Sequence, residues 1–180
     1  MKLLKLFCFS FLIFAIATAP LCEAAQGFDH SPWDAFLKKY VNEKGEVDYA
    51  AVKKDPSMLN AFFELFSDEG PAGFNVTWPR EEMIAFWMNV YNAAVVKLIV
   101  EHYPVKNIQQ IPSVWDITTV HIGKKAQFSL NDIRMKQLML KYRDEKIHLA
   151  LSCGARGCPQ LQRQAFTGAN VEGLLFLPMV

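Results

Sequence analysis

Large apolar side chains recur at helical spacing in the first half of the chain, and they predict a mainly helical N-terminal half. The pattern over residues 28–41 indicates a helix with Ser31 as its N-cap and a proline directly after it. Residues 47–49 follow as a short extended piece, and similar patterns predict helices over residues 58–66 and 80–103. The apolar face of the last helix is so broad that we expect it to be buried in the centre of the fold.

The second half of the chain mixes extended and helical patterns. Residues 117–122 and 127–130 are typical of strands and flank a glycine-containing turn, which predicts a hairpin. Ser129 and Asp132 have the form of a capping box, which would begin a helix that ends at about Tyr142.

Two further elements complete the expected fold. Residues 146–152 alternate apolar and polar side chains, which predicts a strand, and residues 168–176 predict a helix with Thr167 as its N-cap. This order of elements predicts the α+β class: a single domain whose helical N-terminal half packs on a small antiparallel or mixed sheet.

The first 24 residues have the form of a secretory signal peptide. Basic residues precede an apolar run over residues 6–17, and a cleavage site follows at Ala24. The run is shorter than the roughly 20 residues of a membrane-spanning helix, so we expect no transmembrane span. The protein would be exported, periplasmic or secreted, with one domain over residues 25–180. Cleavage would also remove Cys8 and Cys22.

Charge and composition narrow the class of protein. The chain has 19 basic and 18 acidic residues and no basic run, so we expect neither nucleic acid nor an anionic membrane as its main partner. Hydrophobic residues make up 52% of the chain and aromatic residues 13%, which excludes a disordered protein.

Reactive groups are concentrated in residues 147–159, where His148 precedes Cys153 and Cys158, and three interpretations compete. The first is a disulfide that holds a loop in a non-catalytic binding or scaffold domain. The second is a cysteine-dependent hydrolase or acyltransferase, with either cysteine as nucleophile and His148 as base. The third is a metal site that adds His121, but the spacing is not that of common zinc modules, so we expect no metal and no cofactor.

Asn89 and Asn92 lie three residues apart in the expected central helix. A buried amide without a partner is costly, so we expect both side chains to hydrogen-bond neighbouring backbone or loops. In the enzyme interpretation one of them would orient the reacting groups of Cys153, Cys158 and His148. The substrate would then be an unknown small molecule or peptide.

Four motifs of the chain, in order and at compatible spacing, resemble those of one family, the domain of unknown function 547 family. They are FWMNVYNA at residues 86–93, EHYPV at 101–105, SLNDI at 129–133 and IHLALSCGARGCP at 147–159. The matching core spans about residues 80–170. The resemblance implies an exported single α+β domain, and it aligns Asn89, Asn92, His148 and both cysteines with family motifs. It implies no particular reaction.

The chain departs from the family pattern in two places. Arg134 and Met135 stand where the pattern has an acidic residue and a histidine, so an active site that used that pair would be lost here. The family domain usually continues further, so we expect its C-terminal portion to be missing. The apolar residues 174–180 would then form an exposed edge through which the protein associates with a partner.

Overall fold

The computed structural model describes residues 27–67, 78–124, 126–155 and 157–175. The expected signal peptide therefore lies outside the described residues. In chain order the elements are α1 (Ser31–Tyr40), α2 (Tyr49–Lys54), α3 (Ser57–Ser67), α4 (Arg80–Glu101), the 3-10 turn η1 (Ile108–Gln110), β1 (Thr118–Ile122), β2 (Ala126–Ser129), the π-helix η2 (Asp132–Met139), α5 (Leu140–Tyr142), α6 (Lys146–Ala150) and α7 (Val171–Leu175).

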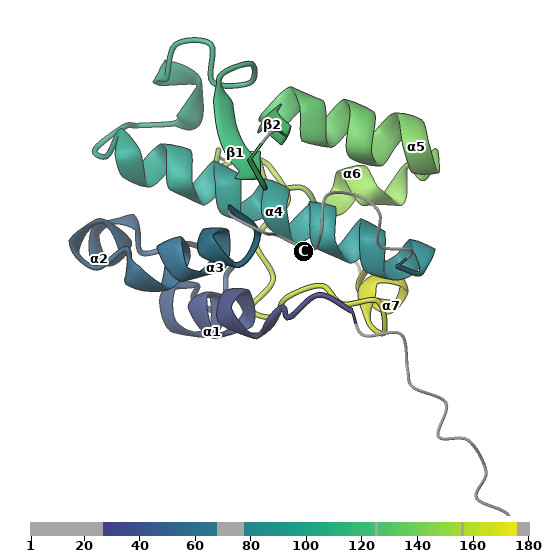
Figure 1. The fold of residues 1–180 in the computed structure, drawn as a ribbon. Helices are drawn as coiled ribbons and strands as arrows, with labels where there is room; N and C mark the ends of the chain where they lie inside the picture. The colour runs from purple at the N-terminus through teal and green to yellow at the C-terminus, as the bar shows by residue number, and fades with distance from the viewer. Residues whose placement is uncertain (1–26, 68–77, 125, 156, 176–180) are drawn as a thin grey trace, which may run out of the picture.

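Helix α4 runs through the middle of the molecule. Figure 1 shows α1, α2 and α3 on one side of it and the hairpin with α5 on the other. Side chains on every face of α4 are buried, among them Trp87 and Met88 at 0% exposure. By length and composition α4 could cross a membrane, with a mean hydropathy of 1.6 over 18 residues, but 89% of that stretch is buried inside the protein. The prediction of a central buried helix is confirmed.

Aromatic rings join the N-terminal helices to α4. Trp33 stacks on Phe36 within α1 at 4.8 Å between ring centroids, and it reaches Phe62 of α3 at 5.5 Å. Phe66 of α3 lies 5.8 Å from Phe86 of α4 in an edge-to-face arrangement. Such pairs each add about 0.5–1.5 kcal/mol beyond the area they bury, so this cluster ties three helices together.

The only sheet in the described part of the chain is the antiparallel pair β1 and β2. His121 pairs with Gln127 and Ile122 with Ala126, around a turn in which Gly123 has a φ of 58°. The expected hairpin is therefore confirmed, and so is the α+β class with its helical N-terminal half and small antiparallel sheet. Phe128 of β2 meets Trp87 at 5.0 Å, which holds the hairpin against α4.

The capping box at the end of the hairpin is also confirmed. The backbone N–H of Ser129 donates to Asp132 Oδ2 at 3.0 Å, and the backbone N–H of Asp132 donates to Ser129 Oγ at 3.1 Å. The helix that follows begins as the π-helix η2 and ends in α5. Ile133 and Leu138 face the core, whereas Met135 is 40% exposed.

The strand predicted over residues 146–152 is wrong, because the chain forms the short helix α6 there. The buried side chains are Ile147, Ala150 and Leu151, which recur at helical spacing, and Leu149 is 55% exposed. Alternation over so few residues fits either element, and the burial pattern identifies the helix.

Two smaller expectations also need correction. Ser31 is the first residue of α1 and not its cap, because the Asp29 carboxylate accepts its backbone N–H at 2.9 Å. The extended piece around Val47 is limited to one isolated β-bridge with Val41, after which Asp48 caps α2.

The apolar C-terminal edge expected over residues 174–180 is described only in part. Leu175 is buried, and residues 176–180 lie outside the described residues.

Candidate functional site

Asn92 holds the segment that leads into the first cysteine. Its Nδ2 donates to the carbonyl oxygen of Ala150 at 3.3 Å, and its Oδ1 accepts the backbone N–H of Ser152 at 2.9 Å. The side chain is 3% exposed, so both ends of the amide are matched inside the core. Asn92 thus joins the central helix to the residue directly before Cys153.

Cys153 and Cys158 form a disulfide, with their Cα atoms 5.6 Å apart. We call Cys153–Ala155 together with Gly157 and Cys158 the disulfide loop. Because both sulfur atoms are in the bridge, neither cysteine is a thiol in this structure. The cysteine residues themselves are partly exposed.

A cleft of about 280 Å³ lies beside the disulfide loop, and we call it the disulfide-loop cleft. It is lined by Gly45, Glu46, Val47, Tyr49, Ser152, Gly154, Ala155, Pro159, Gln160 and Leu161. Burial raises the pKa of Tyr49 to about 12, so its phenol stays protonated at neutral pH and keeps a hydrogen to donate. The cleft therefore offers hydroxyl groups and loop backbone, with Glu46 as the charged residue among those that line it.

His148 is not joined to the cysteines. It lies on the exposed side of α6, where its backbone N–H donates to Glu145. Within the described residues, its imidazole makes no hydrogen bond or ion pair. The contact between base and nucleophile that the enzyme interpretation requires is thus absent from this structure.

Asn89 bonds to the backbone of a second segment, at Phe166, in the same way that Asn92 bonds to Ala150 and Ser152. Its Nδ2 donates to the carbonyl oxygen of Phe166 at 2.7 Å, and its Oδ1 accepts the Phe166 N–H at 3.0 Å. These two bonds leave one amide hydrogen, which points to His30 Nδ1 at 2.9 Å. The imidazole must therefore accept at Nδ1 and carry its proton on Nε2. The expectation that both asparagines bond to backbone is confirmed.

A buried group that sequence reasoning missed continues from this contact. His30 is 5% exposed, and its Nε2 donates to Glu82 Oε1 at 3.0 Å. Glu82 also accepts the backbone N–H groups of Phe28 at 3.0 Å and Gly168 at 2.8 Å. A Cβ added at Gly168 would lie 2.7 Å from Glu82 Oε2, so the carboxylate would have to shift for any larger residue there.

The Glu82 carboxylate is the charged centre of this group. Partial burial raises its pKa, but the hydrogen bonds from His30, Gly168 and Phe28 lower it more, and the net pKa lies below the usual 4.5. The carboxylate lines a second cleft, of about 340 Å³, together with His30, Asp34 and Thr167. His30 and Glu82 are 52 residues apart in sequence, which is why no local pattern revealed them.

The metal interpretation gains no support from the geometry. Within residues 27–67, 78–124, 126–155 and 157–175, no group of three or more His, Cys, Asp or Glu side chains is placed to hold a metal ion. Both cysteines of the expected ligand set are used by the disulfide.

The fold and site together define a small helix-rich α+β domain whose central helix holds a disulfide loop through an asparagine. The chain belongs to the family described as Protein of unknown function, DUF547, whose model matches residues 76–176, more than half of the 180. The match includes both asparagines and the disulfide loop, and it confirms the resemblance seen in the motifs. No curated protein and no solved structure matches the chain.

Proposed function

We propose that this chain is a non-catalytic binding domain that takes its ligand in the disulfide-loop cleft. One observation supports this function most: the cysteines and Asn92 of the expected Cys/His site are used to hold the loop, and the histidine is not beside them. The two sulfur atoms are joined, Asn92 is spent on the backbone of Ala150 and Ser152, and His148 lies apart on α6. A nucleophile needs a thiolate and a base within reach, and this arrangement supplies neither.

The lining of the cleft indicates the class of ligand. The cleft volume of about 280 Å³ is at the small end of ligand sites, which fits a small molecule or a few residues of a peptide. Tyr49 offers a neutral hydroxyl, Ser152 a second one, and Pro159 an apolar surface. Apart from the Glu46 carboxylate, which also lines the cleft, these groups suit an uncharged or weakly polar ligand best.

We also propose that the domain acts outside the cytoplasm. Disulfides persist in oxidising compartments, and residues 1–24 have the form of a signal peptide. An oxidising compartment would favour the closed form of the bridge.

A catalytic assay tests the non-catalytic part of the proposal. We expect the protein to hydrolyse p-nitrophenyl acetate no faster than buffer, with or without dithiothreitol. Cys153→Ser and His148→Ala are the test variants, and thermal unfolding reports whether each one folds. Turnover that both variants lose, with their folding unchanged, would show a thiol enzyme and overturn the proposal.

An NMR screen with a library of small fragments tests the binding part. We expect fragments to shift the amide signals of Tyr49, Ser152 and Gly154, and Tyr49→Phe to weaken the binding of those that use the hydroxyl. Tyr103→Phe is the matched control, because Tyr103 is 38% exposed and does not line the cleft. Fragments that bind only elsewhere on the molecule would contradict this site.

A further inference from the structure

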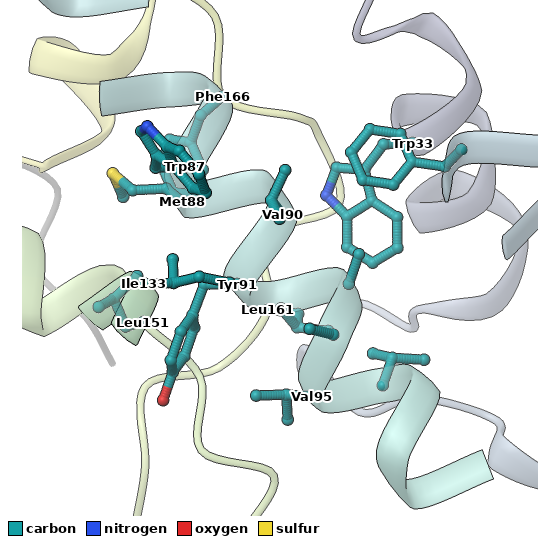
Figure 2. Packing of buried hydrophobic residues seen from close by; sticks show 14 of the residues in the cluster. Trp33, Trp87, Met88, Val90, Tyr91, Val95, Ile133, Leu151, Leu161 and Phe166 are labelled. Carbon is teal, nitrogen blue, oxygen red and sulfur yellow. The ribbon is translucent and has the colours of Figure 1, made fainter. Parts of the chain in front are cut away.

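The segment before the disulfide loop is held without help from the bridge. Asn92 fixes both Ala150 and Ser152, and Leu151 between them is buried among the residues around α4 (Figure 2). Gly154 then passes close to α4 with a φ of 63°, and a Cβ added there would lie 2.4 Å from Ile99 Cδ1. These contacts would remain if the S–S bond were broken.

The segment after the loop is also held independently. Leu161 is 6% exposed and packs into the same core, where Figure 2 shows it near α4. Further on, the backbone N–H of Ala165 donates to Asp34 Oδ1 at 2.9 Å, and Asn89 bonds both polar groups of the Phe166 backbone. The bridge therefore links two segments that are already in place.

The disulfide loop itself has little else to hold it. Its one backbone hydrogen bond within the described residues runs from the N–H of Cys158 to the carbonyl oxygen of Ala155, at 3.2 Å. The N–H of Gly154 reaches Ser152 Oγ only at 3.4 Å. Four residues in the loop or directly beside it, Ser152, Gly154, Ala155 and Pro159, line the disulfide-loop cleft. Whether the disulfide is closed or reduced should therefore affect the position of residues that line the cleft.

We propose that the Cys153–Cys158 bridge is a redox switch that sets the shape of the disulfide-loop cleft. This inference rests on the proposed binding function and adds its regulation. In the oxidised chain the bridge ties Cys158 to Cys153, and in the reduced chain Ala155, Gly157 and Cys158 are released from that tie, while Gly154 stays packed against α4. Because the two cysteine residues are partly exposed, a dithiol reductant can reach the bridge.

The reduction itself proceeds by thiol–disulfide exchange. One thiolate of the dithiol attacks Cys153 Sγ or Cys158 Sγ, which forms a mixed disulfide and releases the other cysteine as a thiolate that takes up a proton. The second thiolate of the reductant then attacks the mixed disulfide and releases the remaining cysteine as a thiol. Two electrons pass from the dithiol, which leaves as its own cyclic disulfide.

Residue-resolved hydrogen exchange by NMR on the full chain tests the switch. On reduction with dithiothreitol we expect the amide of Cys158, which donates to the Ala155 carbonyl oxygen, to exchange at least about tenfold faster. The amides of Ser152 and Phe166, which Asn92 and Asn89 hold, should keep their rates, and oxidised glutathione should reverse the change. The double variant C153S/C158S should match the reduced protein and show no response to dithiothreitol.

Two results would overturn the switch. Faster exchange throughout α4 and at Ser152 would mean that the bridge staples the whole fold, and unchanged rates in the loop would mean that the bridge does not control its shape. The failure of the proposed binding function is distinguishable from both. Turnover of p-nitrophenyl acetate by the reduced chain would refute that function whatever the exchange rates show.

Discussion

Asn89 and Asn92 show at the scale of single residues how α4 holds the C-terminal half of the chain. Each side-chain amide bonds to backbone groups as a neighbouring strand would, but from within a helix. Their partners lie 77 and 58 residues further along the chain. The need for a partner was predictable from burial alone, whereas the identity of the partner was not, because it depends on how distant segments return to α4.

We predict that Asn89→Ala lowers the free energy of unfolding by about 2–4 kcal/mol, because it leaves the Phe166 backbone and His30 without their buried partner. Asn60→Ala is the matched control, since Asn60 is exposed on α3 and should change stability by less than about 0.5 kcal/mol. Urea unfolding followed by fluorescence measures both. Equal losses in the two variants would show that the amide of Asn89 does not hold the fold.

Single elements were predictable where a local signal specified them. The capping box of Ser129 and Asp132 and the hairpin before it both depend on residues a few positions apart. Helix α6 was mistaken for a strand because its five residues carry too little periodicity, and its burial depends on its packing against α7 and η2 rather than on its own sequence. The disulfide followed from the number of cysteines left after the expected cleavage.

At the scale of elements, we predict that Asp132→Ala destabilises the protein by about 1 kcal/mol, because Ser129 loses the carboxylate that accepts its backbone N–H and its hydroxyl in the capping box. Hydrogen bonds from Lys136 and then Ser129 lower the pKa of Asp132 to about 2, from an ordinary value of 3.8. The contribution is therefore complete above pH 3.8 and is lost as the pH falls toward 2. Thermal unfolding at pH 7 and near pH 2 measures it, with the exposed Glu172→Ala as control. An undiminished difference between wild type and Asp132→Ala near pH 2 would contradict this account.

At the scale of the whole molecule, Glu82 in the first turn of α4 links two segments that are distant in sequence, and we call this link the Glu82 closure. Its carboxylate accepts the backbone N–H of Phe28 and the backbone N–H of Gly168. The fold class and the family were predictable, because they depend on element types and on motifs that can be read along the chain. The bonding of Glu82 was not predictable, because one partly buried carboxylate joins three segments that are distant in sequence.

We predict that the Glu82 closure makes the free energy of unfolding fall at acidic pH. The pKa of Glu82 is lower in the folded chain than its usual 4.5, so its stabilising effect is complete above that value and is lost as the pH falls through the folded pKa. Glu82→Gln should be less stable than wild type at pH 7, and the difference should shrink below pH 4.5. Urea unfolding across pH 3–7 measures this, with Glu81→Gln as the control on the more exposed neighbour. A difference that does not change with pH would contradict the role of the charge.

The most direct test of the central claim is the state of Cys153 and Cys158 in the purified protein. Alkylation before reduction, followed by peptide mass mapping, reads that state at each cysteine. A closed bridge gives no alkylation at either residue and a peptide mass two hydrogens below that of the reduced form, and this is the result we predict. Two free cysteines, one of which alkylates rapidly below neutral pH, would indicate an activated thiolate and would contradict a non-catalytic domain held by a disulfide.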